Sequence, residues 1–131
     1  MNVELRYLTL VSMLTGLLWV PYILNEIMVR GLVGAVGYPA NPKPLAKWAQ
    51  RMKAAHYNGV ENLVVFATLV LVAELAGIHG GAVATAAMVY FWARVVHAVA
   101  YTLAIPWLRT AGFAVGAVMY LWIGCEILRA A

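Results

Sequence analysis

The sequence predicts an all-α protein, a bundle of four helices embedded in a membrane. The composition and the spacing of the apolar stretches lead to this prediction. Of the 131 residues, 65% are hydrophobic and only 11% are charged, whereas about a quarter of the residues of a soluble domain are charged. The mean hydropathy is +0.85. Four apolar stretches, each able to form a span of about 20 residues, fill almost the whole chain. We therefore expect a single domain over residues 1–131.

The first two apolar stretches are separated by a loop rich in glycine and proline. The first span is expected at residues 7–28, with a kink at Pro21, because proline cannot donate a helical hydrogen bond. The segment GLVGAVGYPANPKP then predicts a loop, and Pro44 suits the first turn of the next helix. Because the early part of that helix, LAKWAQRMKAAHYN, mixes charged and apolar residues, we expect it to project beyond the membrane. The second span follows at residues 54–76.

A tight turn and a proline delimit the last two spans. The segment GIHGG predicts a turn, and the third span follows at residues 82–104. Pro106 opens the fourth span, at residues 107–128. Within it, Gly112 and Gly116 have the GxxxG spacing that permits close helix packing and suggests a contact between subunits.

The basic residues predict the orientation in the membrane. Five of the nine lie between Arg30 and Lys53, around the loop that joins the first two spans, and Arg109 follows the turn between the last two. Cytoplasmic loops carry an excess of lysine and arginine. We therefore expect both loops to face the cytoplasm and both termini to lie on the opposite side. The net charge of +4 then reflects topology and not nucleic-acid binding.

Three polar residues interrupt the third span, in the segment ARVVHAVAY. Arg94, His97 and Tyr101 fall within about a 60° sector of a helix. An ionisable group in hydrocarbon costs about 2.5 kcal/mol or more and therefore faces the interior of a bundle. The sequence predicts one polar stripe that runs from the middle of the membrane toward the cytoplasm.

The second helix carries the natural counterpart of this stripe. In AAHYNGVEN, Tyr57, Asn58 and Glu61 share a helix face. We expect a structural ion pair between Glu61 and Arg94, with Asn58 and His97 completing a network. Two interpretations remain open, because such a pair either fixes the register of the helices or belongs to a functional site.

Arg109 and Thr110 stand in the first turn of the fourth helix, where backbone amides favour anions. They predict an anion or thiolate site, the alternative being an interfacial anchor. The single cysteine, Cys125, lies far from Arg109 and is expected to be a small buried hydrophobe, so a nucleophilic sulfur would come from a cosubstrate. No metal site is predicted. Haem between His56 and His97 is an alternative, but His56 lies about 140° around its helix from Glu61, so the two histidines are not expected to face a common haem.

Three segments together resemble the MAPEG family, the membrane-associated proteins of eicosanoid and glutathione metabolism. They are AAHYNGVEN, ARVVHAVAY and the PWLRT that opens the fourth helix, and the resemblance extends over essentially the whole chain. The family includes microsomal glutathione transferases and prostaglandin E synthase. The resemblance implies a homotrimer that binds glutathione between subunits, near the cytoplasmic face, and stabilises its thiolate for attack on a lipophilic small-molecule electrophile. By this resemblance, Arg109 matches the arginine that holds the glutathione sulfur as a thiolate, and Arg94 matches the structural arginine that pairs with the glutamate. The positions that match residues around glutathione are Asn58, Glu61, His97, Tyr101 and Thr110.

The chain departs from prostaglandin E synthase at several of these positions. Ala54 and Tyr57 stand where that enzyme has two arginines, and Phe113 aligns with a tyrosine. Arg30 and Arg51 are the candidates to replace the missing cations. Two functions follow: a glutathione-dependent transferase or peroxidase-like enzyme, or a non-catalytic membrane protein of the same family that binds lipid or acts as a scaffold.

Overall fold

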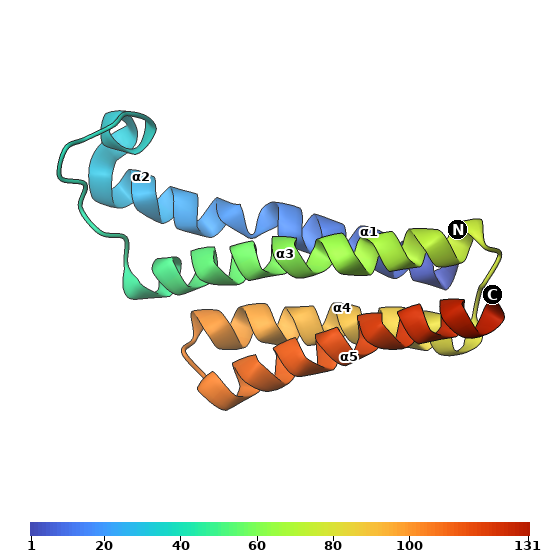
Figure 1. Ribbon diagram of the computed structural model, residues 1–131. Coiled ribbons are helices and arrows are strands. Elements are labelled where there is room, and N and C mark those ends of the chain that lie inside the picture. Colours follow the sequence, from blue (N-terminus) through green and yellow to red (C-terminus); the bar gives the residue numbers. More distant parts are fainter.

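All regular secondary structure is helical in the computed structural model, which describes residues 1–131. The helices are α1 (Val3–Leu17), α2 (Trp19–Val36), α3 (Lys47–Leu75), α4 (Gly81–Thr102) and α5 (Pro106–Ala130). Figure 1 shows them extended along one long axis. Both termini and the α3–α4 turn lie at one end, the termini end, and the α2–α3 loop and the α4–α5 turn lie at the other, the loop end.

α1 and α2 form one bent span, Val3–Val36. The break falls at Leu18, and Pro21, three residues farther on, has no N–H to donate to the carbonyl of Leu17. The predicted kink is confirmed. The helix itself continues past residue 28, where the span was expected to end: it bends at Gly31, whose φ is +72°, and then continues through an apolar turn to Val36.

The other three spans also agree with the prediction, since α3, α4 and α5 are each long and apolar enough to cross a membrane. The bounds of α4 and α5 lie within two residues of those expected. α3 begins at Lys47 and not at Pro44. The N–H of Ala46 donates to Oδ1 of Asn25, 3.0 Å away, and this contact with α2 holds the chain extended up to the start of the helix.

α4 is the innermost helix, with nine buried residues, five of them alanines. These small side chains let α5 approach closely. A Cβ atom at Gly112 would lie 3.0 Å from the carbonyl oxygen of Ala93 and 3.0 Å from the backbone nitrogen of His97. One at Gly116 would contact Arg94 and Tyr90, both on α4. The GxxxG pair is therefore used within the chain, and the hypothesis that it makes a contact between subunits is wrong.

Candidate functional site

The polar stripe of α4 lies against α3 and α5, as predicted. Arg94 is 5% exposed and His97 only 2%, while Tyr101 is half-buried nearer the end of the helix. The rings of His97 and Tyr101 meet edge to face, with centroids 5.5 Å apart. Because the alanines and glycines around the stripe leave room for these larger side chains, α4 buries its polar residues instead of exposing them to lipid.

Asn58 is the group of α3 that meets Arg94. Nη2 of Arg94 donates to Oδ1 of Asn58 at 2.7 Å, and the amide of Asn62 also donates to this oxygen, at 3.3 Å. Nη1 of Arg94 and Nδ1 of His97 are buried and make no hydrogen bond within the chain. The guanidinium is thus only partly satisfied.

The expected ion pair between Glu61 and Arg94 is not present in the chain, and Asn58 takes the place of the glutamate. α3 buries the face that includes Gly59, Asn62 and Phe66. Glu61 lies roughly 130° around the helix from the centre of that face, and it is exposed. The rotation of α3 therefore directs the amide, and not the carboxylate, toward α4.

A polar cavity of about 160 Å³ opens between α3, α4 and α5 near the loop end. Cζ of Arg109 lies 4.8 Å from the centroid of the Tyr101 ring, a stacking that fixes the guanidinium at the cavity wall. Glu61 is the one predicted ligand contact outside this wall. The cavity is lined by Asn58, His97, Tyr101, Arg109, Thr110 and Phe113.

A second cavity of about 160 Å³ shares Tyr101 and Arg109 with the polar cavity. It is lined by Arg51, Tyr101, Ala104, Ile105, Pro106 and Arg109. The Nε–H of Arg51 donates to the carbonyl oxygen of Thr102 at 2.9 Å. We call this second cavity the Arg51 cavity. The charge of Arg51 was visible in the sequence, but its position depends on how the start of α3 meets the α4–α5 turn.

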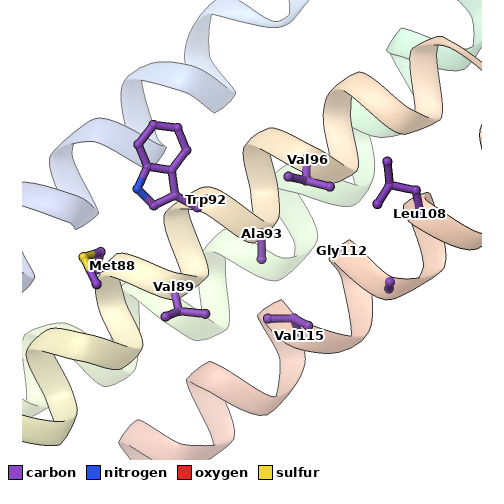
Figure 2. Close-up of a pocket in the computed structure, with 9 residues that line it drawn as sticks. Met88, Val89, Trp92, Ala93, Val96, Leu108, Gly112 and Val115 are labelled. Atoms are coloured by element: carbon purple, nitrogen blue, oxygen red, sulfur yellow. The ribbon is translucent and has the colours of Figure 1, made fainter.

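The largest cavity, about 350 Å³, is an apolar groove between α4 and α5 (Figure 2). Figure 2 shows Val89 and Ala93 of α4 pointing toward α5. Gly112 lines this groove, whereas the next residue, Phe113, lines the polar cavity. The two hollows therefore lie on opposite sides of the α4–α5 contact.

Two further expectations concern sulfur and histidine. Cys125 is exposed on α5, so the prediction that it is buried is wrong. It lies about 24 Å along the helix from Arg109. His56 is hydrogen-bonded to the hydroxyl of Tyr22 on α2, at 2.7 Å, while His97 faces the polar cavity. The chain has no group of three or more His, Cys, Asp or Glu side chains that could hold a metal ion.

Comparison with known proteins gives one match. Residues 8–128 match the model of the MAPEG family, which agrees with the resemblance carried by the motifs on α3, α4 and α5. No curated protein and no solved structure matches the chain.

Proposed function

The chain belongs to the MAPEG family and is an integral, multi-pass membrane protein, and on this basis we propose that it is a glutathione-dependent transferase or peroxidase-like enzyme. The family includes enzymes of these types. Arg109 stabilises the thiolate of glutathione, which attacks a lipophilic electrophile. The observation that carries the proposal is the polar cavity, which gathers Arg109 with Asn58, His97, Tyr101 and Thr110.

The chemistry requires a cation beside the sulfur. A free thiol has a pKa near 8.5 and is about a few per cent ionised at pH 7. Lowering that pKa by about two units takes roughly 2.7 kcal/mol of preferential thiolate stabilisation. The guanidinium of Arg109, half-buried and held over Tyr101 at the wall of the cavity, can supply this amount because a charge near the protein is screened less than one in bulk water. The thiol proton leaves to solvent at the loop end. The thiolate then donates its electron pair to a carbon of the electrophile, and as the sulfur–carbon bond forms, the leaving group (chloride in chlorodinitrobenzene) departs with the electron pair of the bond that breaks.

The remaining residues bind the peptide part of glutathione. Asn58, His97, Tyr101 and Thr110 offer hydrogen bonds around the sulfur. The exposed carboxylate of Glu61 is available to the ammonium group of glutathione. Members of the family typically trimerise, and we include in the proposal a homotrimer with glutathione between subunits. The cluster of cations between Arg30 and Lys53 supports a cytoplasmic loop end, with both termini on the opposite side.

A non-catalytic lipid-binding or scaffold protein of the same family is the second candidate. The apolar groove supports it, because the largest hollow of the chain has almost entirely hydrophobic walls. The uncharged Ala54 and Tyr57 also favour this alternative, since they offer no cation to a carboxylate of glutathione.

Glutathione binding to the detergent-purified protein decides between the two. Calorimetry on the wild type is expected to show saturable binding, accompanied by the ultraviolet absorbance of a thiolate. Arg109→Leu should reduce that absorbance to the few per cent expected of a free thiol and lower kcat/KM at pH 7 with a chlorodinitrobenzene electrophile about 25-fold, the ratio of the thiolate fractions for pKa values of about 6.5 and 8.5. Glu61→Gln should weaken binding of glutathione.

Arg129→Leu is the matched control, because Arg129 is an exposed cation of the same helix that pairs with Glu126 at 2.8 Å. Arg129→Leu should change neither the thiolate absorbance nor kcat/KM. Absence of binding by the wild type up to about 10 mM, above common KM values, would overturn the enzyme proposal and leave the lipid-binding function in its place.

A further inference from the structure

We propose that the junction of α2 with the α2–α3 loop binds one anionic phospholipid of the leaflet at the loop end. The apolar turn, residues 32–36, packs against the acyl chains of the lipid, and a polar cavity beside Lys43 holds its phosphate. This site shares no residue with the two cavities at Arg109, and the inference does not depend on whether the protein uses glutathione.

The bend at Gly31 keeps the apolar turn at the membrane surface. From Val3, where the span opens at the termini end, to Gly31 a helix rises about 42 Å, which equals the thickness of a bilayer with its headgroups, about 40–45 Å. A straight continuation would carry residues 32–36 into water. Figure 1 shows the last turn of α2 lying off the axis of the rest of the helix instead. The turn therefore lies at the boundary between acyl chains and headgroups.

The apolar turn has no cover from the rest of the chain. Its sequence is LVGAV, without a polar side chain. Val33 is 88% exposed, and Leu32 and Val36 are exposed as well. Apolar side chains at the boundary of a bilayer leave water by entering the acyl chains. The turn thus offers a contact for the apolar part of a lipid.

A polar cavity of about 160 Å³ lies directly beside this turn. Arg30 and Gly34 line it from α2, and Asn41 and Lys43 line it from the loop that follows. No acidic side chain is part of its wall. We call it the Lys43 cavity. Because Gly34 belongs to the apolar turn, a lipid that packs against the turn has its headgroup within reach of this cavity.

Arg30 holds the loop against α2 and so positions Lys43. The Nε–H of Arg30 donates to the carbonyl oxygen of Lys43 at 2.8 Å, and its Nη1 donates to Glu26. Nη2 makes no hydrogen bond within the chain. Lys43 belongs to none of the three ion pairs of the chain. Its backbone is fixed at the cavity, and its ammonium group is free to bind a ligand.

The charge of the Lys43 cavity matches a phosphodiester. Arg30 and Lys43 bring two positive charges, and Glu26 offsets one of them, which leaves one net positive charge. A phosphodiester carries one negative charge. The guanidinium, the ammonium group and the amide of Asn41 can all donate to its unesterified oxygens. A zwitterionic headgroup brings an ammonium group of its own, which the two cations repel, so the cavity favours an anionic lipid such as phosphatidylglycerol.

Binding of single lipid molecules to the detergent-purified protein, measured by native mass spectrometry, tests this site. The wild type should bind phosphatidylglycerol on the order of tenfold more tightly than phosphatidylcholine. Lys43→Gln should weaken the affinity for phosphatidylglycerol about fivefold, the contribution of one lysine to an anionic lipid. A large excess of inorganic phosphate should compete poorly, because it has no acyl chains to contact the apolar turn.

Lys47→Gln is the matched control. Lys47 is exposed at the start of α3, and it lines neither the Lys43 cavity nor the two cavities at Arg109. The substitution removes the same charge at the same end of the bundle. It should change the affinity for phosphatidylglycerol by less than about twofold, since salt screens a distant exposed charge.

The depth of the apolar turn is a separate measurement. Cys125 is the single cysteine of the chain, so a Cys125→Ala background allows one spin label to be attached at Val33→Cys. In lipid nanodiscs this label should be more accessible to oxygen, which dissolves among acyl chains, than to a water-soluble nickel chelate. A label at Ala40→Cys, in the exposed part of the loop, should show the reverse preference.

Four results would overturn the inference. Equal losses of phosphatidylglycerol affinity in Lys43→Gln and Lys47→Gln would mean that only the overall charge attracts the lipid. Competition by inorganic phosphate at the affinity of the lipid would make the cavity a site for a free anion. A weaker glutathione affinity in Lys43→Gln, with lipid affinity unchanged, would assign the cavity to the thiol. A label at Val33→Cys that prefers the nickel chelate would place the apolar turn in water.

Discussion

The two ends of the bundle differ in whether their buried and cavity-lining charged groups have partners within the chain. At the termini end, Glu4 is 3% exposed and accepts a hydrogen bond from the N–H of Gly80, at the start of α4. Glu74 accepts from the amide of Asn2 at 2.9 Å and lies 3.2 Å from Nδ1 of His79. Each carboxylate has a partner from another part of the chain, and together they fasten α1 to the α3–α4 turn.

In the half of the bundle toward the loop end, three guanidinium groups have no carboxylate partner. Arg94 is buried with one nitrogen unpaired, and Arg51 and Arg109 line cavities. Arg30, which pairs with Glu26, is the exception and lies at the α2–α3 loop. Exposed Arg6, at the termini end, also lacks a carboxylate partner. Among buried and cavity-lining groups, those that the chain pairs hold helices together, and those that line a cavity without a carboxylate partner are available to a ligand.

Removing the one acceptor of Arg94 should have the largest effect on stability. Asn58→Leu leaves the buried guanidinium without a hydrogen bond from α3, and we expect a loss of about 3 kcal/mol in the free energy of unfolding. Asn58→Asp keeps the acceptor and supplies the missing negative charge, so it should be at least as stable as the wild type. Reversible unfolding in sodium dodecyl sulfate measures both. Equal stability of the leucine and aspartate variants would contradict the view that Asn58 compensates Arg94.

The sequence was sufficient for features that depend on local pattern. Hydropathy placed the four spans, the missing N–H of Pro21 placed the kink, and the 100° step of a helix placed Arg94, His97 and Tyr101 on one face. Five of the six predicted ligand-binding or catalytic residues line one cavity because each was chosen from a single helix end or helix face.

The features that were missed depend on how one helix is rotated or seated against another. The sequence offered both Asn58 and Glu61 as partners for Arg94, and only the packing of Gly59 and Phe66 in the bundle selects the amide. The Arg51 cavity likewise requires the start of α3 to reach the α4–α5 turn. No spacing within one segment carries that information.

The contacts of Glu4 and Glu74 at the termini end should contribute to stability and not to glutathione binding. Glu4→Gln keeps an oxygen that can accept from Gly80 but removes the charge that strengthens the bond. We expect a loss of about 1.5 kcal/mol in the free energy of unfolding, with glutathione affinity unchanged. Glu126→Gln, in an exposed pair with Arg129, is the control and should cost less than about 0.5 kcal/mol. A weakened glutathione affinity in Glu4→Gln would break the division between the two ends.

The smallest expected effect has the opposite sign, and it lies between the two ends. The ring of Tyr90 stacks on Phe66, with centroids 3.8 Å apart, but its buried hydroxyl makes no hydrogen bond within the chain. Tyr90→Phe keeps the stacking and removes a desolvated polar group, so the protein should gain about 1 kcal/mol in the free energy of unfolding. Tyr7→Phe, at a half-buried tyrosine that packs against Phe91, should change little. A loss of stability in Tyr90→Phe would mean that the hydroxyl is hydrogen-bonded in the assembled protein, and Tyr90 would then belong with the satisfied groups that hold helices together.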